Sequence, residues 1–344
     1  MSRLAPNGIQ ELSTVFAKQF EGYGVAVAYS AAGDRVLALM GEGDLVGLDP
    51  TSGEDCFRVR AHAGANGMAV NPKHPVVATA GQDGRAAVFD TRSGEKLQEL
   101  PSGSPWVEHL AYSPDGELLA TSSGKRVRIW RKDGEPVFES EDHESTVAAV
   151  QFGRDGKRFA TCCYGGARVY SLAERKETHH FKWKGSLVAL AWSPDDKVLA
   201  CASQDASVHF WRLSTGRDSE MSGYRFKPKE LAWDGNASLL ATGGDIAITL
   251  WDFRGKGPEG TRPIQLGAHK GVVSALAFAP RKALLASGGE ETAVFLWDPR
   301  KSPMALGFAL LNDVVTGLAW HPKGETFAAL SAAGDLKMLA ARSA

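Results

Sequence analysis

The side chains in this sequence that are best suited to chemistry lie in one stretch near the C-terminus. They are an imidazole, a hydroxyl, a carboxylate and an indole, from His269, Ser287, Glu291 and Trp297. The first three groups are the components of a hydrolase triad, in which the imidazole takes the proton of the hydroxyl. The sequence lacks the G-x-S-x-G motif that presents a nucleophilic serine on a sharp turn, and Ser287 lies in an apolar run that strands would cover. We therefore interpret the four residues as a structural network and expect no catalytic residues.

Paired cysteines and histidines form the second chemical signal, because thiolates and imidazoles are ligands that zinc prefers. The pairs are Cys162-Cys163 and His179-His180. Neighbouring residues of a strand point to opposite faces, so at most one cysteine and one histidine share a side. The pairs also fall on strands two spacings apart, or roughly 9–10 Å. We expect no metal site here, and no disulfide framework from the four cysteines, Cys56, Cys162, Cys163 and Cys201.

A glycine-rich run, Gly255-Lys-Gly257-Pro-Glu-Gly260, matches the G-x-G-x-x-G fingerprint of dinucleotide sites. That motif binds pyrophosphate only where it joins a strand to the N-terminus of a helix. No helix-forming run follows, and the next element is the strand-like run at Ile264–Leu266. We interpret the glycine-rich run as a loop, and we expect no cofactor.

A repeated unit must position these residues. Each unit holds short β-type runs separated by Pro- and Gly-containing turns. The residue that closes the first run recurs every 40–45 residues, at Tyr29, Val70, Tyr112, Phe152, Trp192, Trp233, Phe278 and Trp320. The residue that closes the third run keeps the same step, at Leu48, Phe89, Trp130, Tyr170, Trp211, Trp251, Trp297 and Leu339. A period of this length, with four short strands per unit, is typical of propeller blades.

The units also carry Trp-Asp pairs, at Trp251-Asp252 and Trp297-Asp298, and Ser-Pro-Asp turns, at Ser113 and Ser193. In these features nearly the whole chain resembles WD-repeat proteins. The resemblance implies an all-β fold, a single closed eight-bladed propeller. Seven blades are the alternative, if the first or last unit is degenerate. Stacking blades around an axis buries both faces of each blade.

The last unit stops after its third strand and needs a fourth from elsewhere. We expect residues 14–20 to be that closing strand, residues 14–344 to be the propeller and residues 1–13 to be an N-terminal tail. Residues 9–20 also fit helical spacing, so helix and strand both stay open for this segment.

The resemblance implies a role for the four residues named first. In WD-repeat proteins a histidine, a serine or threonine, an aspartate and a tryptophan form a hydrogen-bonded network inside a blade. Glu291 stands where aspartate is usual. A narrower resemblance links the stretch from Trp211 to Gly260 to bacterial WD-repeat proteins whose genes lie near zinc-homeostasis GTPase metallochaperones. That resemblance implies a partner in metal handling.

Composition narrows the classes of partner. Lys plus Arg is 39 and Asp plus Glu is 40, a balance that does not point to nucleic acid or to an anionic membrane. No apolar run approaches the roughly 18 residues of a membrane helix. The N-terminus lacks the apolar core of a secretory signal, so we expect a cytoplasmic protein with reduced thiols.

Aromatic residues in the turns on one face are the remaining signal. We expect them to be exposed and to bind a partner, since interfaces favour large amphipathic side chains. The predicted partner-binding residues are Tyr23, Trp106, Tyr164, Trp183 and Tyr224, with Arg126 and Gln204 beside them. The sequence therefore predicts a non-enzymatic scaffold that binds a protein or peptide, as a monomeric propeller within a complex. An accessory protein in zinc homeostasis and a propeller enzyme with a central-channel site are the alternatives.

Overall fold

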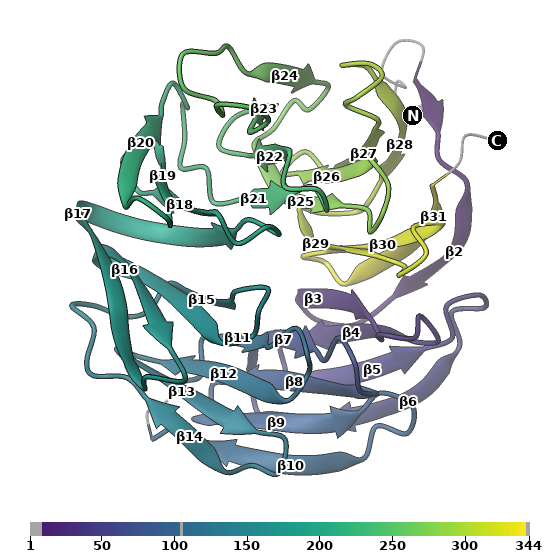
Figure 1. The fold of residues 1–344 in the computed structure, drawn as a ribbon. Coiled ribbons are helices and arrows are strands. Elements are labelled where there is room, and N and C mark those ends of the chain that lie inside the picture. The colour runs from purple at the N-terminus through teal and green to yellow at the C-terminus, as the bar shows by residue number, and fades with distance from the viewer. Residues whose placement is uncertain (1–8, 104–105, 342–344) are drawn as a thin grey trace.

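The computed structural model describes residues 9–103 and 106–341, and every regular element in these ranges is a β-strand. The described residues form no helix that could span a membrane. Short antiparallel strands follow one another around a ring, as Figure 1 shows. The expectation of an all-β propeller is confirmed.

The strands of each sequence unit are adjacent in space. Unit one is β3 (Gly24–Tyr29), β4 (Val36–Met40), β5 (Asp44–Leu48) and β6 (Asp55–Arg60). Unit two is β7 (Ala65–Val70), β8 (Val76–Gly81), β9 (Arg85–Asp90) and β10 (Lys96–Pro101). Unit three is β11 (His109–Tyr112), β12 (Leu118–Ser123), β13 (Arg126–Arg131) and β14 (Pro136–Glu139). Units four and five share β15 (Ala149–Phe152), β16 (Arg158–Ser171), β17 (Lys176–Trp192), β18 (Val198–Ser203), β19 (Val208–Arg212) and β20 (Arg217–Met221).

The remaining units complete the ring. Unit six is β21 (Leu231–Trp233), β22 (Leu239–Thr242), β23 (Ala247–Asp252) and β24 (Ile264–Gly267). Unit seven is β25 (Val273–Phe278), β26 (Leu285–Gly289), β27 (Ala293–Trp297) and β28 (Ala305–Leu310). Unit eight is β29 (Val315–Trp320), β30 (Thr326–Ser331) and β31 (Asp335–Ala340). Two N-terminal strands, β1 (Gln10–Glu11) and β2 (Thr14–Gln19), join units seven and eight.

Counted as hydrogen-bonded sheets, the ring has seven blades, and the expectation of eight separate blades is corrected. One sheet has six strands because units four and five are joined in it. Residues 159–162 of β16 pair with β15, whereas residues 164–171 pair with β17. Residues 187–192 of β17 then pair with β18. The alternative of seven blades is therefore the one that the number of sheets supports. The reason is that units four and five share one sheet, and not that the first or last unit is degenerate.

The core lies between neighbouring units. Eight apolar clusters each combine residues of two consecutive units, and one of them joins unit eight to unit one. The second strand of a unit is covered on both faces, so strands such as β4 are buried along their whole length. Outer strands such as β6 alternate between exposed and buried residues. Packing between units therefore positions every turn on the two faces of the ring.

The N-terminal segment closes the ring. β2 pairs antiparallel with β31 and supplies the outer strand of unit eight. β1 pairs in parallel with β28, and the Leu12 backbone N–H donates to the Phe308 carbonyl at 2.7 Å. Leu12 is buried in the cluster between units seven and eight. We expected residues 1–13 to be a tail. Residues 10–12 instead belong to the propeller, because β1 pairs with the edge of β28 and the Leu12 side chain is buried. Residues 1–8 lie outside the described part of the chain.

Candidate functional site

The unit-seven network is assembled, and its histidine, serine and tryptophan are buried. Trp297 Nε1 donates to Ser287 Oγ at 2.8 Å, and Ser287 Oγ lies 2.7 Å from His269 Nε2. His269 Nδ1 lies 2.5 Å from Glu291 Oε1. Since Ser287 Oγ already accepts from Trp297, its own hydrogen can go to His269 Nε2, and His269 Nδ1 can then donate to the carboxylate. Ser287 has no exposed surface, so a substrate cannot reach its hydroxyl.

The extra methylene of glutamate does not break the last link of this network. Partial burial by itself raises the pKa of Glu291, but the hydrogen bond from His269 and nearby backbone N–H groups outweigh it, and the pKa is lowered. The carboxylate therefore stays ionised beside the imidazole. Both groups act within the blade, where they tie the turn after β26 to the connection before β25.

Other units carry variants of the same network. In unit two, His62 Nε2 lies 2.8 Å from Thr79 Oγ1, and its Nδ1 lies 3.1 Å from Asp83 Oδ2. In unit six a tyrosine replaces the histidine: Trp251 Nε1 donates to Tyr224 Oη at 2.7 Å, and Tyr224 Oη lies 2.8 Å from Thr242 Oγ1. Burial raises the pKa of Tyr224 to about 12, so the phenol stays neutral.

Two of the five aromatic residues expected at the partner surface make contacts within the blades and are only partly exposed. Tyr224 belongs to the unit-six network, with its ring packed in the cluster between units five and six. The Trp183 ring contacts His209 at an interplanar angle of 38°, with ring centroids 3.6 Å apart, and its Nε1 donates to Ser203 Oγ at 3.4 Å. Tyr224 takes the place that histidine has in units two and seven, whereas Trp183 lies within β17, is only partly buried and lines a separate cavity.

The other predicted partner-binding residues are exposed but are not gathered at one place. Tyr23, Trp106 and Tyr164 each expose about half of their surface. Arg126 is held by Asp142 at 2.6 Å and Glu139 at 2.9 Å. Tyr23 and Gln204 line one cavity together, and Trp183 lines another.

The cavity of Tyr23 and Gln204, which we call the channel mouth, has a volume of about 920 Å³ and is lined in part by the first strands of units one, seven and eight. Its residues come from units one, five, six, seven and eight. They are Tyr23, Val25, Gln204, Ala206, Arg225, Phe226, Lys227, Lys229, Glu230, Val272, Val273, Ser274, Glu290, Val314, Val315 and Thr316. Valines of β3, β25 and β29 form its apolar wall, and turns from the same face form its rim.

The rim carries two aromatic rings and an uneven set of charges. Tyr23 is 54% exposed and Phe226 is 52% exposed. Arg225 pairs with Asp245 at 2.8 Å, whereas Lys227 and Lys229 make no ion pair with the described residues. Burial raises the pKa of Glu230 to about 7, although nearby Lys229 opposes the shift. At neutral pH the rim therefore presents free ammonium groups beside a carboxyl group that is only partly ionised.

Comparisons with known proteins decide the family. Four segments of the chain, residues 94–131, 134–171, 175–212 and 260–298, match the model of the WD domain, G-beta repeat. A crystal structure of a computationally designed protein, Ika8, superposes with a TM-score of 0.83 at 19% identity, over 96% of this chain and 99% of the designed one. These matches fall on the same ring of strands. The chain is a WD-repeat β-propeller.

Curated relatives of the propeller are similar over part of their length. The chain is 28% identical to Pre-mRNA-processing factor 19 homolog 2 of Arabidopsis thaliana, over 52% of this chain and 36% of the relative. It is 26% identical to Pre-mRNA-processing factor 19 of Oryza sativa, over 66% and 45%. It is 27% identical to anaphase-promoting complex subunit cdc20 of Dictyostelium discoideum, over 49% and 36%. The propeller thus spans less than half of the length of these relatives.

The propeller does not assemble the cysteine and histidine pairs into a metal site. No group of three or more His, Cys, Asp or Glu side chains suited to a metal occurs among the described residues. Cys162 and Cys163 are buried, and Cys162 packs with Cys201 in the cluster between units four and five. The pKa of the Cys201 thiol is raised mainly by burial and also by the neighbouring Cys162.

Sequence reasoning missed the residues of the channel mouth that lie in the connection before unit six. Phe226, Lys227 and Glu230 belong to the run Tyr224-Arg-Phe-Lys-Pro-Lys-Glu230. The signal was present, because an aromatic residue between basic ones in a connecting turn is unusual for a blade interior. The buried Pro228 holds this turn, so that Phe226 projects outward while Tyr224 points inward.

Proposed function

We propose that this WD-repeat propeller is a non-enzymatic scaffold that binds a segment of another protein at the channel mouth. The observation that carries the proposal is the pair of half-exposed rings, Tyr23 and Phe226, on the rim of a cavity of about 920 Å³. Aromatic side chains are enriched among the residues that dominate binding energy at interfaces. Trp106 and Tyr164 are also exposed, but they do not line this cavity and the proposal does not depend on them.

Two further observations support a binding role over catalysis. The only Ser–His–acid set predicted from the sequence is buried and satisfied within its blade. The names of the relatives also describe parts of larger assemblies, such as a subunit of the anaphase-promoting complex. The zinc-homeostasis alternative gains no support from the geometry of the cysteine and histidine pairs.

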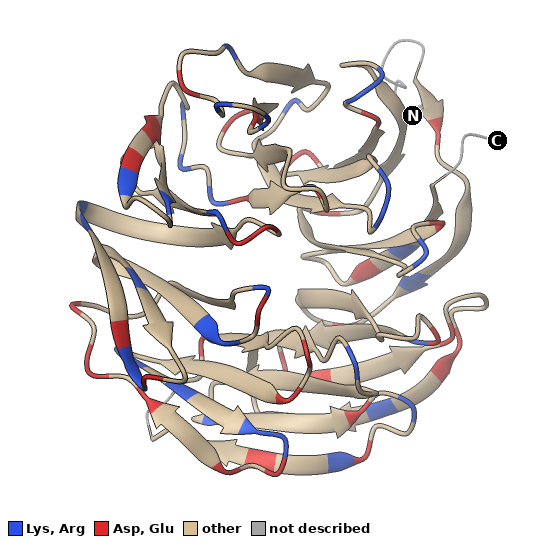
Figure 2. Cartoon of the chain, in the orientation of Figure 1, with Lys and Arg blue, Asp and Glu red and all other residues tan. Residues whose placement is uncertain are grey.

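The proposal does not include nucleic acid as the primary ligand. Figure 2 shows positive and negative residues interspersed around the ring, without a continuous basic stripe. The basic group around Arg126 is neutralised in part, since Arg126 and Arg128 both contact Glu139. Relatives are nevertheless named for pre-mRNA processing and for the U3 small nucleolar RNA, so RNA binding is a defined outcome of the test.

The test is affinity capture followed by reconstitution with the captured protein in purified form. We expect the double variant Tyr23→Ala, Phe226→Ala to weaken the purified complex at least about tenfold, because an aromatic anchor typically contributes about 2 kcal/mol or more. Met304→Ala is the matched control, since Met304 is 63% exposed and does not line the channel mouth. Equal loss in the control, or capture that nuclease treatment abolishes, would contradict the proposal.

A further inference from the structure

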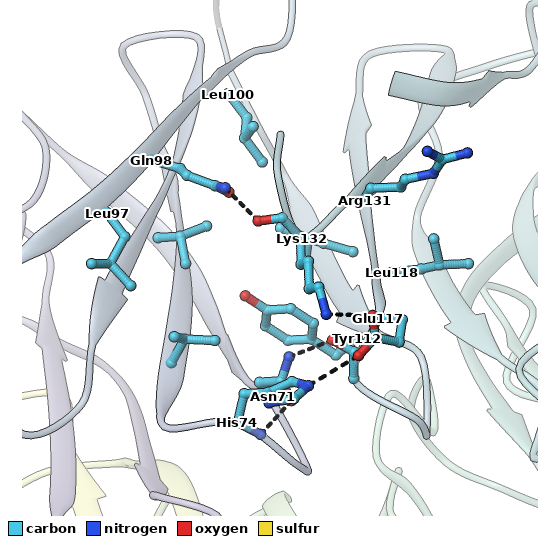
Figure 3. Close-up of a pocket in the computed structure, with 14 residues that line it drawn as sticks. Asn71, His74, Leu97, Gln98, Leu100, Tyr112, Glu117, Leu118, Arg131 and Lys132 are labelled. Atoms are coloured by element: carbon cyan, nitrogen blue, oxygen red, sulfur yellow. Dashed lines mark hydrogen bonds and ion pairs between the residues drawn. The ribbon is translucent and has the colours of Figure 1, made fainter. Parts of the chain in front are cut away.

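A second cavity lies between units two and three, away from the channel mouth. It is formed by the outer strand β10 of unit two and by turns of both units, as Figure 3 shows. The turns join first to second strands, at Asn71–Val76 and Gly116–Leu118, and third to fourth strands, at Arg131–Lys132. Turns of these two kinds lie at the opposite end of a four-stranded blade from those at the channel mouth. The cavity is therefore independent of the site proposed above.

The walls of this interblade pocket are mainly apolar. The apolar side chains are Val76, Val88, Leu97, Leu100, Leu118 and Leu119, with the ring of Tyr112 among them. Leu97 stands at the lip and is 47% exposed, although it belongs to a strand. The volume is about 220 Å³. Since small-molecule sites usually measure roughly 300–1,000 Å³, this pocket suits a single side chain of a larger partner.

Tyr112 places one polar group inside the apolar walls. Figure 3 shows its ring in the middle of the pocket, below Gln98 and between Leu97 and Leu118. The hydroxyl makes no hydrogen bond to another described residue, and burial raises its pKa, so it keeps its proton. Tyr112 is only partly buried, so solvent in the open pocket can reach this hydroxyl. A backbone carbonyl of a bound segment would satisfy this donor.

The rim of the pocket carries more positive than negative charge. Glu117 is the only carboxylate among the described residues that line it, and it is shared by Lys132 Nζ at 3.0 Å and His74 Nε2 at 3.1 Å. Arg131 stands beside Leu118 and has no ion pair with a described residue. Asp133 and Glu135 follow in the same turn but do not line the pocket. An acidic group on the partner would complement Arg131.

Beside the pocket, the outer edge of β10 is not paired with another strand of the described chain. β10 is the last strand of its sheet, so its outer backbone groups have no neighbouring strand. Such an edge accepts an extended segment, whose alternate side chains then point toward the pocket. We propose that the interblade pocket binds an extended segment of a partner protein that inserts one aliphatic side chain between Leu97 and Tyr112 and places an acidic residue near Arg131.

Selection from a displayed library of random linear peptides on the full chain tests this inference. We expect the enriched peptides to share an aliphatic residue next to Asp or Glu. Leu97→Glu should weaken the binding of these peptides at least about tenfold, because it removes the apolar lip and repels the acidic residue. Tyr112→Phe, which removes only the hydroxyl, should weaken it several-fold. Binding is measured by fluorescence anisotropy with labelled synthetic peptides.

Leu306→Glu is the matched control. Leu306 is also the second residue of a fourth strand, β28, whose outer edge β1 covers, and is 38% exposed, but it does not line the pocket. Arg131→Glu should shift a repeated selection from acidic to basic residues and leave thermal stability unchanged. The inference is overturned if no peptide is enriched, or if Leu97→Glu and Leu306→Glu bind equally well. Peptides whose binding depends on Tyr23 and Phe226 would also overturn it, and would support the channel mouth instead.

Discussion

Single residues of this propeller divide into those that hold a blade together and those that face a partner, and residue type alone does not separate them. Tyr224 and Phe226 are two positions apart in one turn, yet one is hydrogen-bonded inside unit six and the other is half exposed. The network of His269, Ser287 and Trp297 could be named from the sequence through the resemblance to WD-repeat proteins, in which these residue types form such a network. The place of Tyr224 inside unit six could not be predicted from the sequence, because its phenol replaces the imidazole that the network usually contains.

Glu230 makes the stability of the propeller depend on pH. Its pKa is about 7 in the fold, because burial disfavours the carboxylate, against 4.5 as its ordinary value. A carboxyl group whose folded pKa is raised costs no stability below its ordinary pKa. Its destabilising effect grows as the pH rises through the window between the two values, and is complete above the folded pKa.

We therefore expect Glu230→Gln to stabilise the propeller at pH 8 by on the order of 1–3 kcal/mol, because each pKa unit corresponds to about 1.4 kcal/mol and solvent in the open mouth reduces the full value. The variant and the wild type should have equal stability near pH 4. Urea denaturation at both pH values measures the difference. A stabilisation of the same size at pH 4 would show that titration of Glu230 is not its cause. Glu290→Gln, on the same rim, is the control.

At the scale of elements, the sequence predicted strands well and their continuity poorly. The turn signals at Gly165-Gly166 and Gly185 indicate breaks between strands. The backbone instead runs through them as β16 and β17, with a register shift between Tyr164 and Gly166. Whether a bend interrupts a strand depends on pairing with residues distant in the sequence, such as Tyr164 with Ser186. Local turn preference does not contain that information.

β2 is the element on which closure of the ring depends. Removing residues 1–19 should lower the melting temperature and promote aggregation, because the edge of β31 becomes unpaired and Phe16 no longer packs on the cluster between units eight and one. Removing residues 1–12 is the control that takes away β1 and Leu12 but leaves β2 in place. Differential scanning calorimetry and light scattering compare the two. If both truncations melt alike, β2 does not close the ring in solution.

At the scale of the whole molecule, the period of the repeat predicts a ring, but not the two cavities. The period is visible because every unit must pack on the next in the same way. The channel mouth instead collects side chains from five units, such as Tyr23 from unit one and Phe226 from unit six. The interblade pocket exists because Leu97 of unit two and Tyr112 of unit three line the same space between their blades. These positions follow from the closed geometry, so a one-dimensional pattern does not specify them.

Closure should also make unfolding cooperative. In an open repeat array each unit contacts only its neighbours, and parts of the array can unfold separately. Here the eight clusters form an unbroken circuit, so the loss of one unit exposes apolar surface on both neighbours. Phe159 tests this coupling, because it is fully buried between units three and four and stacks on Tyr170 with centroids 4.8 Å apart.

We expect Phe159→Ala to destabilise the propeller by about 3–5 kcal/mol, the usual cost of truncating a buried phenylalanine. The variant should still unfold in one transition, with coincident curves from tryptophan fluorescence and far-ultraviolet circular dichroism. Phe159→Leu should cost less and give the same single transition. Curves that separate in Phe159→Ala would contradict the coupling, because units three and four would then unfold while the rest of the ring stays intact.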